Sequence, residues 1–128
     1  MRPIFLIRIA LLLGVTTFAA VTVYLRASGK LPAPAAEAAA KLAILRYAVW
    51  AVSGLALAWA FWWKQRAEAA MTEQGVHQAL IIGWAPGEAA ALLGAATHFA
   101  GGPVASLGFG MLAFVAVLLV LRIPAPSR

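Results

Sequence analysis

Four long apolar stretches dominate this chain of 128 residues and leave room for little else. They cover residues 4–25, 42–63, 79–100 and 104–121. A helix needs about 20 residues to cross a hydrocarbon core of about 30 Å. Apolar residues make up 64% of the chain and charged residues only 11%, which is far from the composition of soluble proteins. We therefore predict a single integral membrane domain over residues 1–128.

The spans are predicted to be helices rather than the strands of a β-barrel. A barrel strand alternates apolar and polar residues over about ten positions, whereas these stretches are continuously apolar and rich in Ala and Leu. Pro32 and Pro34 mark the first break, a polar run over residues 64–75 the second, and Gly101-Gly102-Pro103 the third. The predicted fold class is all-α, a bundle of four transmembrane helices with up-down topology and short loops.

The first stretch has the basic start of a secretory signal peptide, and a cleaved signal peptide is the alternative to a span. It runs for 22 residues, contains Arg8 and shows no convincing small-x-small cleavage site before Arg26. These features favour an uncleaved span.

Basic residues are distributed unequally between the two sides of the predicted bundle. With four spans both termini share one side, which collects six basic residues: Arg2, Arg8, Lys64, Arg66, Arg122 and Arg128. The other side collects Arg26, Lys30 and Lys41, with Arg46 one turn into the second span. Under the positive-inside rule this asymmetry predicts cytoplasmic termini. The expected location is a bacterial inner (cytoplasmic) membrane, which the chain crosses several times. The net charge of +6 is spread over both sides without a basic stripe, so we expect no nucleic-acid partner.

Aromatic residues gather at both ends of the second span. They are Tyr47, Trp50, Trp59, Trp62 and Trp63. Such positions are typical of side chains that anchor a helix at the membrane interface. A quinone or haem site is the alternative, but no other feature supports it. With no Cys, and with His77 and His98 too far apart on one helix to share a metal, we expect neither a cofactor nor a metal.

One carboxylate, Glu88, lies near the middle of the third stretch. A charged side chain at a helix centre costs about 2.5 to 3.5 kcal/mol on insertion, so such a residue is normally neutral, paired or turned toward a polar interior. Glu88 is therefore the candidate for a proton-binding or buried polar site.

Small residues form a ridge beside this carboxylate. Gly83, Gly87, Ala91 and Ala95 recur at every fourth position, and the first two make a GxxxG pattern that lets helix backbones approach closely. This ridge is predicted to be a helix-packing surface. Pro86 cannot donate a backbone hydrogen bond and disturbs the carbonyl of Ile82, so we predict a helix kink there.

Two arginines are the candidate partners of Glu88. Arg8 enters the first span from the cytoplasmic side and Arg46 enters the second from the other side. A long arginine side chain can reach across several Å of depth, and by depth Arg8 is the better placed. For both arginines the alternative is simple extension toward lipid headgroups.

The third apolar stretch, with its polar start, reads His77-Gln78-Ala79-Leu80-Ile81-Ile82-Gly83-Trp84-Ala85-Pro86-Gly87-Glu88-Ala89-Ala90-Ala91-Leu92-Leu93-Gly94. It resembles the third span of a group of small four-span bacterial membrane proteins of uncharacterised function. In that group a polar-apolar start leads to a central Glu followed by small and apolar residues. The resemblance implies the four-span fold and no particular activity.

No catalytic arrangement is recognisable, and we expect the protein not to be an enzyme. The predicted function is that of a small membrane protein that associates with itself or serves as an accessory subunit of a larger membrane complex. The alternative is a proton-coupled transporter or ion-path component centred on Glu88.

Overall fold

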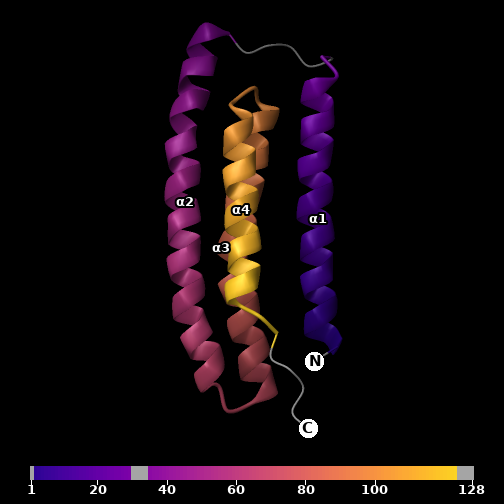
Figure 1. Ribbon diagram of the computed structural model, residues 1–128, viewed down its shortest axis with the longest axis vertical. Coiled ribbons are helices and arrows are strands. Elements are labelled where there is room, and N and C mark those ends of the chain that lie inside the picture. Colours follow the sequence, from indigo (N-terminus) through magenta and orange to yellow (C-terminus); the bar gives the residue numbers. More distant parts are fainter. Residues whose placement is uncertain (1, 30–34, 124–128) are drawn as a thin grey trace.

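The computed structural model describes residues 2–29 and 35–123, and this part of the chain folds into four helices. They are α1 (Arg2–Ala27), α2 (Ala36–Ala69), α3 (Glu73–Phe99) and α4 (Val104–Val120), and they run alternately up and down (Figure 1). The predicted all-α four-helix bundle with short loops is confirmed. The predicted turn at Pro32 and Pro34, and the basic residues Lys30 and Arg128, lie outside the described residues.

The first three helices are long and apolar enough to cross a membrane, so the chain is a multi-span membrane protein by length and composition. α4 differs from them. Its 17 residues extend for about 26 Å at 1.5 Å per residue, which is less than the hydrocarbon core of about 30 Å. The predicted fourth span thus corresponds to a short helix.

α2 extends beyond its predicted span at both ends. It has 34 residues and a length of about 51 Å, compared with the 22 residues of the apolar stretch. The polar run that begins at Lys64 does not end the helix, because Lys, Gln, Arg, Ala and Glu are good helix formers in water as well. The link to α3 is reduced to residues 70–72, and Thr72 caps α3 by accepting a hydrogen bond from the Gly75 N–H at 3.0 Å.

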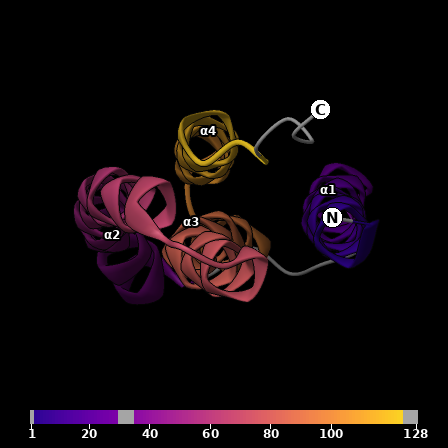
Figure 2. The ribbon, with the colours of Figure 1, turned by 90° about the horizontal axis from the view of Figure 1, so that it is seen from below.

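α3 is the central helix of the bundle. It packs against α1, α2 and α4, while α1 stands on its far side from α2 (Figure 2). The core therefore forms where α3 meets its three neighbours. Its largest fully buried side chains are Trp84 and Phe114, with Leu80, Val117 and Leu121 around them.

The closest approach in the bundle joins α3 to α4. A Cβ atom placed on Gly110 would lie 2.4 Å from the Ala90 carbonyl oxygen, and one on Gly94 would lie 2.4 Å from the Ser106 carbonyl oxygen. Only glycine leaves room for backbone contact of this kind. Because lipid tails are as apolar as leucine side chains, close backbone packing is a main source of helix association in membranes.

α1 is attached along one stripe of its surface. Its buried residues Ile4, Val15, Ala19 and Thr22 follow helical spacing, and Arg8 and Arg26 fall on the same stripe near its two ends. Arg26 Nε donates a hydrogen bond to the carbonyl oxygen of Phe99, at the end of α3, at 2.8 Å. The stripe thus ends in polar contacts where the apolar packing stops.

Candidate functional site

The carboxylate of Glu88 faces a groove between α1 and α3. The groove has a volume of about 430 Å³. Besides Glu88 it is lined by Ile7, Ala10, Leu11, Gly14, Val15, Phe18 and Leu92. Glu88 is half-buried, and it is the one charged residue of this lining. A costly acidic group therefore lies against apolar side chains, at a surface that α1 only partly covers.

The structure does not bring Glu88 together with either candidate arginine. Arg8 Nη2 donates to the Leu118 carbonyl oxygen at 2.9 Å, and Arg46 Nη2 donates to the Tyr47 hydroxyl oxygen at 3.0 Å. Within residues 2–29 and 35–123, Glu88 forms no ion pair and no side-chain hydrogen bond. The polar partner predicted for it is therefore not supplied by this part of the chain.

Arg8 binds the end of α4 instead, because that end offers free acceptors. The last carbonyl groups of a helix lack partners within the helix. Arg8 takes the Leu118 oxygen, Arg122 Nε takes the Leu119 oxygen at 3.1 Å, and Trp84 Nε1 takes the Leu121 oxygen at 3.0 Å. The two cations also lie at the negative end of the helix dipole. Three donors from α1, α3 and the chain after α4 thus stabilise the point where this short helix stops.

Replacing Arg8 with methionine should destabilise the bundle by about 1.5 to 3 kcal/mol, the usual cost of losing a hydrogen bond to a charged group. Methionine keeps an unbranched apolar stem but leaves the Leu118 carbonyl without this donor. Thermal unfolding in a mild detergent measures the change. Arg46→Met is the matched control, since among the described residues Arg46 contacts the exposed Tyr47 and Trp50 on its own helix and no other helix. Equal losses of thermal stability in the two variants would show that the hydrogen bond from Arg8 to Leu118 does not stabilise the bundle.

The proline of the third helix is accommodated by a neighbouring helix. Pro86 lies inside α3, which continues through it from Glu73 to Phe99. Its missing N–H frees the carbonyl of Ile82, four residues earlier. Trp59 Nε1, from α2, donates to that carbonyl oxygen at 3.0 Å. Trp59 was predicted as an interface anchor, and the structure gives it this additional contact between helices.

The small-residue ridge lies within the bundle. Gly83, Gly87, Ala91 and Ala95 are all buried. A Cβ atom on Gly83 would lie 2.3 Å from Leu121 Cδ1, and one on Gly87 would lie 3.0 Å from Val117 Cβ. The ridge therefore packs against α4 and the residue that follows it, and Glu88 points to the other side, toward α1.

The aromatic residues of α2 form two groups, both several residues away from the ends of the helix. Trp59, Trp62 and Trp63 are in mutual ring contact, and Arg66 lies over the Trp62 ring at 4.3 Å. Tyr47 and Trp50 meet edge to face at 5.4 Å. Trp63 differs from a typical interface anchor, because its Nε1 is buried and has no partner among the described residues.

No protein-family model, curated protein or solved structure matches this chain. The function is therefore inferred from the geometry of the site.

Proposed function

We propose that this protein is a non-enzymatic membrane protein that associates within the bilayer, with a second copy or with a subunit of a larger membrane complex. The observation that carries the proposal is Glu88, half-buried in the groove between α1 and α3 and without a partner in the described residues. A partner helix in this groove would supply a hydrogen-bond donor to the carboxyl group and cover the apolar residues around it.

The lining of the groove favours association over ion passage. Seven of its eight residues are apolar, and a path for ions needs polar groups or water along its length. Gly14 adds to this argument, because a Cβ atom there would meet nothing within 4 Å. A helix surface with Ala10 and Gly14 one turn apart leaves space for another backbone.

The basic residues support a cytoplasmic location of both termini in a bacterial inner membrane. Arg8, Lys64, Arg66 and Arg122 all belong to the end of the bundle at which the chain starts and α4 finishes (Figure 1). The exposed apolar side chains of the helices then contact the lipid bilayer.

Glu88→Leu and Glu88→Gln test the proposal. Association is measured by energy transfer between differently labelled copies in liposomes and by co-purification in mild detergent. Leucine removes the hydrogen bond to the partner and should weaken association about 3- to 30-fold, whereas glutamine retains hydrogen bonding and should preserve most of it. Glu37→Leu is the control, because Glu37 is exposed and pairs with Lys41 on its own helix at 3.6 Å.

The same variants distinguish the alternative, a proton-binding carboxylate. Glu88→Gln cannot exchange a proton, so it would abolish proton flux across liposomes while leaving association intact. A pH-sensitive dye inside the liposomes reports that flux. Association that is unchanged in Glu88→Leu, combined with flux that is lost in Glu88→Gln, would replace the association proposal with the proton-coupled one.

A further inference from the structure

α1 carries an exposed hydroxyl group beside the groove that contains Glu88. Thr17 is exposed, and its Oγ1 forms no hydrogen bond in the part of the chain that the structure describes. The buried Thr22 of the same helix differs, because its Oγ1 donates to the Ala19 carbonyl oxygen at 3.0 Å. A hydroxyl group that faces lipid without a partner is unfavourable, so Thr17 marks a surface that gains stability from a polar neighbour.

Thr17 lies next to the groove when the residues of α1 are followed around the helix axis. Val15 is buried in the core, and Gly14, which lines the groove, is turned by about 100° from it. Thr17 is turned by about 60° further in the same direction, and in depth it falls between the groove residues Gly14 and Phe18. The faces of α1 therefore follow in the order core, groove and hydroxyl group.

A second copy of the chain fits this order of faces. Copies inserted in the same direction can be related by a two-fold axis along the membrane normal, which keeps equal residues at equal depth. The groove faces of the two α1 helices can then meet at Gly14, where a Cβ atom would meet nothing within 4 Å. The next face around each α1, which carries Thr17, is thereby directed toward the other copy's α3. On that helix Glu88 is the polar residue that lines the groove.

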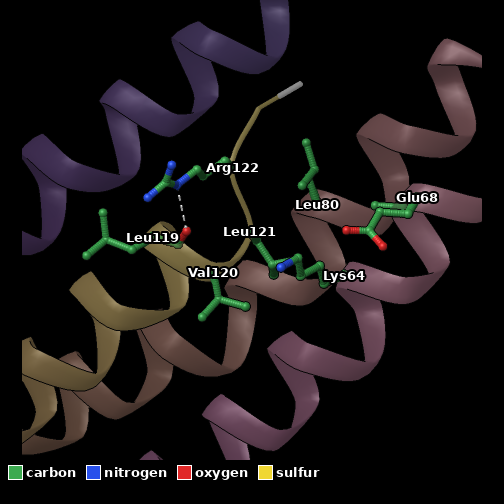
Figure 3. Close-up of a pocket in the computed structure, with 8 residues that line it drawn as sticks. Lys64, Glu68, Leu80, Leu119, Val120, Leu121 and Arg122 are labelled. Carbon is green, nitrogen blue, oxygen red and sulfur yellow. Dashed lines mark hydrogen bonds between the residues drawn. The ribbon is translucent and has the colours of Figure 1, made fainter. Parts of the chain in front are cut away.

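The cations at the end of α4 are less suited to Glu88 than this hydroxyl group. Arg8 and Arg122 both donate to carbonyl groups at that end, and Figure 3 shows Arg122 directed toward the Leu119 oxygen that it binds. A two-fold axis along the membrane normal leaves these cations at the same depth in the second copy. Thr17 is the donor that α1 offers within the depth of the groove.

We propose that the partner of Glu88 is a second copy of this chain in a parallel two-fold pair. The α1 helix of each copy lies in the groove of the other, and the Thr17 hydroxyl donates to the Glu88 carboxyl group of the other copy. Two such bonds form in each pair, one on each side of the axis. This pairing rests on the association proposed above and names its partner.

Crosslinking through single cysteines tests whether the partner is a second copy. The chain contains no Cys, so Gly14→Cys introduces its only thiol, and the new side chain has room within its own copy. A disulfide forms where two Cα atoms lie within about 7 Å of each other. We expect the purified Gly14→Cys protein to form a covalent dimer on mild oxidation in liposomes. Leu112→Cys, on the exposed surface of α4, should remain monomeric.

Thr17→Val tests the donor, because valine keeps the shape of the side chain and removes its hydroxyl group. Energy transfer between labelled copies in liposomes should show association weakened about tenfold, since each pair loses the bond twice. Thr17→Ser keeps the hydroxyl group and should preserve most of the association. Thr16→Val is the matched control, because Thr16 is also exposed but is turned about 100° further from the groove. Equal weakening by Thr16→Val and Thr17→Val would overturn the role of Thr17.

Mixing two variants tests whether the bonds are reciprocal. A pair of one Thr17→Val copy and one Glu88→Leu copy keeps one intact bond, whereas a pair of either variant alone keeps none. Energy transfer should therefore be higher for the mixture than for either variant by itself, and equal values would overturn the two-fold pair.

The second copy and the proposed function can fail separately. Unchanged association of Glu88→Leu would reject the proposed function and the pair with it. A Gly14→Cys protein that stays monomeric, while Glu88→Leu still weakens co-purification with another membrane subunit, would reject only the pair.

Discussion

Gly110→Ala should lower the free energy of unfolding by about 1 to 3 kcal/mol, although it adds only one methyl group. The added Cβ atom would lie 2.4 Å from the Ala90 carbonyl oxygen and 3.2 Å from the Ala91 Cα. Both are backbone atoms, so no side chain can turn aside to make room. α3 and α4 would have to separate, and the contacts around Phe114 and Val117 would loosen with them. Thermal unfolding in mild detergent measures the loss.

Gly108→Ala is the control on the same helix. A Cβ atom there would meet nothing within 4 Å, and alanine favours a helix over glycine by about 1 kcal/mol. We therefore expect this variant to be as stable as the wild type or slightly more stable. If Gly110→Ala and Gly108→Ala unfolded at the same temperature, the close backbone contact between α3 and α4 would be refuted.

Trp84→Ala should have the largest effect of any single truncation, about 3 to 5 kcal/mol. Trp84 is fully buried at the centre of the bundle and donates to the Leu121 carbonyl oxygen at 3.0 Å. Trp84→Phe separates the two contributions, because it keeps most of the ring volume and removes only the donor. Leaving the buried carbonyl without this partner should cost about 1 to 3 kcal/mol.

Trp50 provides the matched control for these two substitutions. It is about half exposed, at 45%, and contacts Tyr47 and Phe109 through its ring. Trp50→Ala and Trp50→Phe should both be much milder than the same changes at Trp84. A Trp84→Phe variant as stable as the wild type would show that the bond to the end of α4 contributes nothing.

Hydropathy predicts the four helices well, and their ends less well. The apolar stretches identify where a segment can lie in lipid, but a helix continues into water as long as its residues favour helical structure. α2 illustrates the difference, since it runs on through the charged residues Lys64 and Arg66 to Ala69. At α4 the prediction holds to within one residue, since the helix runs from Val104 to Val120 and the apolar stretch from 104 to 121.

The sequence predicts the depth of Arg8 and Glu88 in the membrane, but not the direction in which each side chain points from its helix. Counting residues from the predicted span starts places Arg8 and Glu88 about five residues, or about 7.5 Å, apart in depth, yet it does not show which acceptor the guanidinium selects. The carbonyl of Leu118 lacks a partner within the helix because it lies in the last turn of α4, and the sequence does not show that Arg8 of α1 lies beside that turn. The same limitation applies to Trp84, whose role as a donor to Leu121 has no signal in the sequence.

The sequence predicts the effect of Pro86 on the helix backbone, but not the side chain that compensates for it. The sequence implies that Pro86 frees the carbonyl of Ile82. It does not identify Trp59 as the donor, because Trp59 lies 23 residues before Ile82, on another helix, and its position also suits the membrane interface. A signal for the closest helix contact was present and was missed, since Ser106 and Gly110 are small residues four positions apart on α4, opposite Ala90 and Gly94.

The short fourth helix gives the protein a hydrophobic belt of uneven thickness. Around α4, whose Leu112, Val115 and Leu119 are exposed, the apolar surface is about 4 Å shorter than an average hydrocarbon core, while the apolar stretch 42–63 of α2, about 33 Å long, matches that core. Lipids beside α4 must thin or tilt to match it, at a cost of a fraction of a kcal/mol per Å. The protein therefore favours thinner bilayers, and in a thicker one the strained lipids around α4 would draw that face toward any neighbour able to cover it.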